Sequence, residues 1–215
     1  MFTSCDSGAY YAIDEKPKIK IDTNLLGIWV QGSYDCYMVQ TFDDVYRQVT
    51  DEFKNDSAYL FEEKNKGYLY YLTEIQDQSM ETPLFVAFMS KVNKDMLANV
   101  TGFSPHKFRK MQPQKTSYIF VTLTLNKAHN EGTLTPFYDT TIQLLTSSAE
   151  VRRRFEQRGN KILRPDANVV FKKISSYHAS AKEAKILAKK LRNKNIGVRS
   201  NRTDSIIDLS KPIKK

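Results

Sequence analysis

The chain has 215 residues, of which 40% are hydrophobic and 27% charged, a balance that argues against a largely disordered chain and supports a packed core. No stretch approaches roughly 20 consecutive apolar residues, so a membrane-spanning helix is not expected. The net charge of +9 is unevenly divided. Residues 1–150 hold 14 Lys/Arg and 19 Asp/Glu, a net charge of −5, whereas residues 151–215 hold 19 and 5, a net charge of +14.

Three segments differ in composition. Residues 1–22 are predicted to be a flexible polar leader, because the run Asp14-Glu15-Lys16-Pro17-Lys18 has no periodicity and contains a proline. Residues 23–175 are predicted to form a single β domain, and residues 176–215 a basic helical tail.

The β domain contains many short runs of strand type separated by turn residues. In residues 116–125, apolar side chains alternate, with Ile119, Val121 and Leu123 on one face. Two hairpins are predicted, one at residues 64–67 and one at residues 93–95. The expected strands are residues 27–31, 37–42, 45–49, 57–63, 67–75, 84–92, 96–103, 116–125 and 133–138. About eight strands without crossover helices predict an antiparallel β-barrel or sandwich, and an up-and-down barrel would leave no exposed edges.

A helix and one more strand follow. Ser147 and Glu150 fit a capping box, Val151 and Phe155 would share one helix face, and Gly159 can end the helix. Residues 168–174 form a further strand that could pair back onto the barrel edge. In the tail, an Ala/Leu stripe predicts a second helix, with a basic surface formed by Lys182, Lys185, Lys189, Lys190 and Arg192.

The segment Leu25-Leu26-Gly27-Ile28-Trp29 resembles the opening of lipocalins and of bacterial lipocalin-like lipoproteins. In those families a short helical turn precedes Gly-x-Trp, the glycine allows close backbone approach, and the tryptophan packs across the closed end of the barrel. Residues 144–174 are similar to the end of the bacterial members, so the resemblance covers residues 24–174. It implies an arginine stacked on Trp29, with Arg152, Arg153 and Arg154 as candidates. The second lipocalin signature, Thr-Asp-Tyr, has no match, which puts a classical small-ligand lipocalin in doubt.

No catalytic motif is found, and neither the two cysteines nor the three scattered histidines have metal-ligand spacing. We therefore expect a non-enzymatic protein without cofactor or metal. Barrels of about eight strands either fill with side chains or hold one small ligand. The aromatic residues expected inside are Tyr59, Phe61, Tyr68, Tyr70, Phe85 and Phe88. They could line an apolar pocket, but their bulk favours filling it.

Two functional hypotheses follow. The first is a binding or structural protein of the bacterial cell envelope that takes a small apolar ligand or a protein partner. Its lipid anchor would be Cys5, since an apolar residue, Thr-Ser and a cysteine are typical of the end of a lipoprotein signal peptide. The alternative is a cytoplasmic accessory protein that binds nucleic acid through the basic tail. The tail could instead contact an anionic membrane or the acidic barrel itself.

Overall fold

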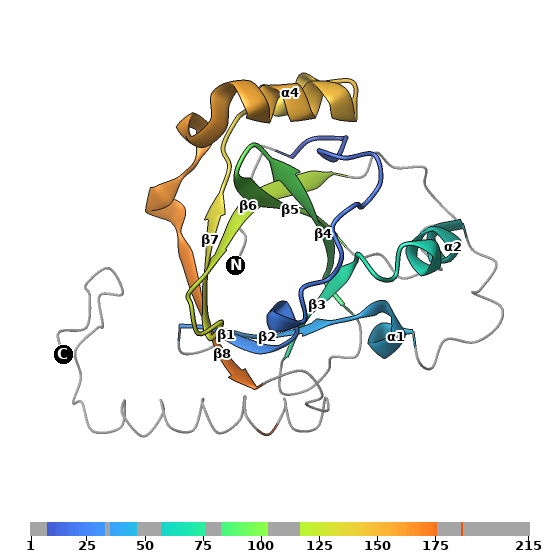
Figure 1. Cartoon of the computed structure of the whole chain (residues 1–215), viewed down its shortest axis with the longest axis vertical. Helices are drawn as coiled ribbons and strands as arrows, with labels where there is room; N and C mark the ends of the chain where they lie inside the picture. Colours follow the sequence, from blue (N-terminus) through green and yellow to red (C-terminus); the bar gives the residue numbers. More distant parts are fainter. Residues whose placement is uncertain are drawn as a thin grey trace, which may run out of the picture.

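The protein is described by a computed structural model, which covers residues 8–32, 35–46, 57–75, 83–102, 117–175 and 186. Eight antiparallel strands form one closed barrel in chain order, seen nearly end-on in Figure 1. The strands are β1 (Gly27–Gln31), β2 (Asp35–Gln40), β3 (Tyr70–Glu74), β4 (Phe85–Val92), β5 (Asp95–Gly102), β6 (Tyr118–Leu125), β7 (Glu131–Pro136) and β8 (Val169–Ser175). The prediction of a mainly β protein with an antiparallel barrel of about eight strands is confirmed.

The barrel closes between its first and last strands. Trp29 on β1 pairs with Lys173 on β8, and Gln31 pairs with Phe171. The strand expected at residues 168–174 is therefore the eighth strand of the barrel. Closure leaves no unpaired edge, so every strand has two hydrogen-bonded neighbours.

The strand expected at 57–63 and its hairpin are wrong, because residues Ser57–Lys64 form a helix, α2. The strand expected at 45–49 does not begin at Val45, because Phe42–Val45 form a short helix, α1; residues 47–49 lie outside the described ranges. In α2 the buried side chains are Tyr59 and Glu62, three residues apart, which is the spacing of one helix face and not of a strand face.

Helices α1 and α2 lie outside the barrel beside β3 (Figure 1). Thr41 begins α1 with a capping box completed by Asp44. The carboxylate of Glu62 accepts hydrogen bonds from the hydroxyls of Tyr46 (2.6 Å) and Tyr71 (2.8 Å), which tie α2 to the outer face of β3. Burial of this carboxylate is tolerated because its oxygens are hydrogen-bonded.

Helix α4 (Ser148–Arg158) begins and ends at the predicted residues. The Ser147 side chain accepts a hydrogen bond from the Glu150 amide, and Gly159 ends the helix with φ 49°. The helix lies between β7 and β8 in the chain, so it precedes the last strand instead of following the barrel. Three short 3-10 turns surround it in sequence: η3 (Ile142–Leu144), η4 (Gly159–Ile162) and η5 (Pro165–Ala167).

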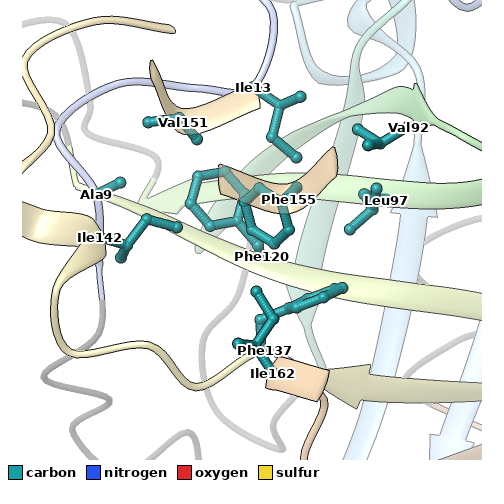
Figure 2. Close-up of a cluster of buried hydrophobic side chains, with 10 residues drawn as sticks. All are labelled: Ala9, Ile13, Val92, Leu97, Phe120, Phe137, Ile142, Val151, Phe155 and Ile162. Carbon is teal, nitrogen blue, oxygen red and sulfur yellow. The ribbon is translucent and has the colours of Figure 1, made fainter. Parts of the chain in front are cut away.

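An outer apolar core joins α4 to the barrel wall (Figure 2). The ring of Phe155 is the centre of this core, with its centroid 5.0 Å from that of Phe120 on β6 and 4.7 Å from that of Phe137. Phe155 and Val151 are both almost completely buried, as expected for one face of the helix. Phe120 can therefore face outward from β6, because α4 covers it.

Residues 8–22 differ from the flexible leader that was expected. Ala9 pairs with Tyr118 through two backbone hydrogen bonds, and the Ile13 amide donates to the side-chain carbonyl of Asn99 at 2.8 Å. The buried carboxylate of Asp14 accepts a hydrogen bond from Arg152 on α4 at 2.9 Å. Ala9 and Ile13 fill gaps in the outer core, and their burial stabilises an ordered segment despite its polar composition.

Candidate functional site

The interior of the barrel contains an apolar cavity of about 130 Å³. Successive residues of a strand point to opposite faces, so each strand contributes every second residue to the lining. The lining residues are Leu25, Trp29, Tyr37, Val39, Tyr70, Leu72, Phe85, Ala87, Met89, Ala98, Val100, Val121, Leu123, Gly132, Leu134 and Phe171. The rings therefore do not fill the barrel, although their bulk favoured that interpretation of the sequence.

Small residues on three strands leave this space open. Ala87 and Ala98 face the cavity from β4 and β5, and Gly132 faces it from β7. A Cβ added at Gly132 would lie 3.2 Å from a methyl of Leu125 and 3.6 Å from the Trp29 ring. The tight contact is the one with Leu125, so the glycine makes room for this leucine, whereas the two alanines make room for the cavity.

Trp29 packs at the barrel end where β1 begins, called here the Gly27 end. Its indole N–H donates to the Leu25 carbonyl at 2.8 Å, which fixes the ring against η1 (Thr23–Leu25). Gly27 has φ 129°, a conformation that residues with a Cβ rarely adopt, so it permits the sharp entry from η1 into β1. The Tyr70 hydroxyl accepts from the Asp22 amide at 2.6 Å and ties the start of η1 to β3.

The cation over Trp29 is Lys173, and none of the three arginines that the lipocalin resemblance implied takes this place. The Lys173 ammonium lies 5.5 Å from the Trp29 ring centroid and donates to the Asn24 carbonyl at 2.7 Å. Burial lowers the pKa of Lys173, and the charge of Asp22 opposes that effect. Arg152 and Arg154 instead bind Asp14 and Asp139 on the outside of the barrel.

Tyr37 is a lining residue that lies near two carboxylates, Asp35 and Glu74. Burial raises the pKa of its hydroxyl to about 12, with further contributions from the negative charges of Asp35 and Glu74. Its ring stands edge-on to that of Phe171, with centroids 5.8 Å apart. The phenol therefore stays protonated at neutral pH and can donate a hydrogen bond.

The predicted cavity residues lie in several places. Tyr70 and Phe85 line the cavity. Tyr59 is buried between α2 and the outer barrel wall, and Phe88 lies in the same outer cluster on the opposite face of β4 from Phe85. The other two residues, Phe61 and Tyr68, belong to α2 and the turn after it, and Phe61 is exposed.

Most of the residues that line the cavity were not predicted from the sequence, although the pattern of one strand indicated some of them. Val121 and Leu123 belong to the alternating apolar face of residues 116–125, and that face is the inner one. In β4 both faces are apolar, because α1 and α2 cover the outside, so alternation could not distinguish Ala87 and Met89 from Phe88.

Several predicted sites fall on residues outside the described ranges. These are the lipidation candidate Cys5 and the basic tail surface of Lys182, Lys185, Lys189, Lys190 and Arg192. Among the residues that the structure does describe, no group of three or more metal-ligating side chains is found, and no helix is long and apolar enough to cross a membrane.

The chemistry of the cavity wall suits the binding of an apolar molecule. Its wall is made of aliphatic and aromatic side chains, and its two phenols, Tyr37 and Tyr70, are protonated, since burial also raises the pKa of Tyr70 to about 12. Such a wall binds apolar surface by removing it from water. No protein-family model, no curated protein and no solved structure matches this chain.

Proposed function

We propose that the barrel binds one small apolar molecule in its interior and that the protein acts without catalysis. The observation that supports this proposal is the cavity of about 130 Å³ with its apolar lining. A cavity of about 150 Å³ lined by Leu, Ile and Phe stays dry and binds benzene or xenon. The expected ligand is therefore the size of a single aromatic ring or a short hydrocarbon, well below the roughly 300–1,000 Å³ of a drug-sized site.

The affinity for such a ligand is limited by its size. Small ligands gain at most about 1.5 kcal/mol per non-hydrogen atom, and ordinary ones much less. For a molecule of about seven carbons at half that ceiling, the binding free energy is about 5 kcal/mol, which corresponds to a Kd of roughly 0.2 mM. A molecule of this affinity exchanges quickly and fits a role in carriage or sensing of an abundant compound.

Toluene is a suitable probe for the cavity. The Met89 methyl group lies in the lining, and its ¹³C NMR signal should shift saturably during a toluene titration. In the variant Ala98→Leu, which places three more carbons in the cavity, the shift should disappear. The control is Ala149→Leu, because Ala149 is exposed on α4 outside the barrel. An absent Met89 shift in the unaltered protein, or an equal shift in Ala98→Leu, would contradict the proposal.

The proposal includes a location in the bacterial cell envelope with a lipid anchor at Cys5, which rests on the sequence alone. Mass spectrometry of the protein isolated from its own cells would find an acylated cysteine at this position. An unmodified Cys5 thiol preceded by its encoded residues would contradict the anchor and leave the binding proposal in place.

A further inference from the structure

The barrel end opposite Trp29, called here the Gln31 end, carries acidic side chains on the inner face of the wall. Tyr37 and Val39 on β2 line the cavity, and Asp35 shares their face by alternation. On β3, Glu74 lies on the same face as the lining residues Tyr70 and Leu72.

The strand register brings these two carboxylates together. Asp35 pairs with Gln31 at the end of β1, and Glu74 pairs directly with Tyr37. Both are close enough for their charges to raise the pKa of the Tyr37 hydroxyl, after the larger effect of burial. Asp35 and Glu74 therefore flank Tyr37, the cavity phenol that pairs with Trp29 at the middle of β1, on the side towards the Gln31 end.

Within the described ranges, no salt bridge neutralises Asp35 or Glu74. Lys173 lies at the Gly27 end, where it donates to Asn24. Like Asp35 and Glu74, it stands beyond the residues that line the cavity itself. The interior thus has an apolar middle, a cation beyond Trp29 at one end, and two carboxylates at the other.

We infer that the cavity selects small apolar molecules that carry an amine, with the apolar body in the barrel and the ammonium group at Asp35 and Glu74. This inference rests on the proposed function and names its ligand class. An ammonium group donates three hydrogen bonds, and carboxylates only accept them. The edge-on rings of Tyr37 and Phe171 add aromatic surface of the kind that attracts cations.

A cation loses less hydration at these partly exposed carboxylates than it would at fully buried ones. Asp35 and Glu74 are partly exposed, so an ammonium group beside them keeps water contacts and avoids the large cost of full desolvation. A ligand carboxylate at the same position would face two like charges. A fatty acid or an aromatic acid is therefore disfavoured, although its apolar body would fit the cavity.

Three probes of nearly the same shape separate charge from fit: toluene, benzylammonium and benzoate. Partly exposed charge pairs have modest effects, so benzylammonium should bind roughly fivefold more tightly than toluene, and benzoate roughly fivefold more weakly. Raising the salt concentration to 1 M, where the screening length is about 3 Å, should reduce both differences. The Met89 methyl signal reports binding of all three probes.

The variant Asp35→Asn with Glu74→Gln should bind all three probes with nearly equal affinity and keep its toluene affinity. The control is Asp95→Asn with Glu131→Gln, which removes the same charge at the Gly27 end on the outward-facing positions of β5 and β7. This control should keep the preference for benzylammonium.

The outcomes distinguish the two proposals. If toluene binds but the three probes have equal affinity in the unaltered protein, or benzoate binds best, the amine inference is overturned and the apolar cavity stands. If the preference survives in Asp35→Asn with Glu74→Gln, these carboxylates are not its cause and the inference also fails. If none of the probes shifts the Met89 signal, the proposed function itself fails.

Discussion

Filling the cavity with protein side chain should stabilise the barrel while it removes ligand binding. Ala98 lies on β5 between Met89 and Val121 of the neighbouring strands, and its methyl group faces the cavity. Ala98→Leu adds three carbon atoms in a direction where the structure has open space. Most enlargements of core side chains are destabilising because no such space exists. A gain in the free energy of unfolding would therefore show that the cavity is empty, and a loss would show that it is not.

The magnitude follows from burial and side-chain entropy. Three buried carbons contribute about 0.8 kcal/mol each, or about 2.4 kcal/mol, and ordering a leucine side chain costs about 0.5–1 kcal/mol. The net gain in the free energy of unfolding is about 1–2 kcal/mol. In a chain of this length that gain raises Tm by roughly 3–6 °C.

The assay is urea unfolding of Ala98→Leu and of the control Ala149→Leu. The control should change the free energy of unfolding by less than about 0.5 kcal/mol, because Ala149 is exposed on α4. A loss of about 1–3 kcal/mol in Ala98→Leu, the usual cost of overpacking, would refute the reasoning, since it would mean that side chains already occupy the space.

Two further predictions concern the outer core and its ion pair. Phe155→Ala should lower the free energy of unfolding by about 3–5 kcal/mol in urea unfolding, because the ring is almost completely buried, whereas Leu144→Ala, at a side chain that is 73% exposed, should have little effect. Burial acts to raise the pKa of Asp139, but hydrogen bonds and the charge of Arg154 outweigh it and lower the value to about 2. Because the folded pKa lies below the ordinary 3.8, the carboxylate stabilises the fold above that pH and the effect is lost as the pH falls towards 2. Asp139→Asn should therefore cost about 2 kcal/mol at pH 7 and roughly half as much at pH 3, and a cost independent of pH would contradict the account.

The parts of the fold that follow from short-range chemistry could be predicted from the sequence. The alternation around Val121 and the turn at Asn93, which has φ 55°, define neighbouring strands of the barrel. Ser147 and Gly159 determine the ends of α4. The Ser147 side chain accepts a hydrogen bond from a backbone amide of the first turn, and Gly159 adopts the positive φ that ends the helix.

The errors arose where tertiary contacts decide the structure. Residues 57–63 were expected to be one strand of a hairpin, and the contacts of Glu62 with Tyr46 and Tyr71 stabilise them as a helix instead. Lys173 reaches Trp29 only because β8 closes onto β1, a pairing that no local pattern specifies. The lipocalin resemblance had instead implied an arginine, one of Arg152, Arg153 or Arg154.

The cavity itself could not be predicted, because it is the space that remains after the inner side chains are packed. Ala87 and Ala98 are ordinary strand residues in the sequence, and only the closed barrel places them around one space with Leu123 and Leu134. The basic tail, which lies outside the described residues, predicts an anionic partner, and that prediction stays open. The cation that we infer at Asp35 and Glu74 is a separate proposal about the barrel.

A crystal structure under xenon pressure tests the central claim most directly, because xenon binds dry apolar cavities without needing a specific shape. The account predicts a xenon atom inside the barrel, in contact with Trp29, Met89 and Val121. A barrel interior filled by its own side chains, with xenon bound only outside or not at all, would contradict it.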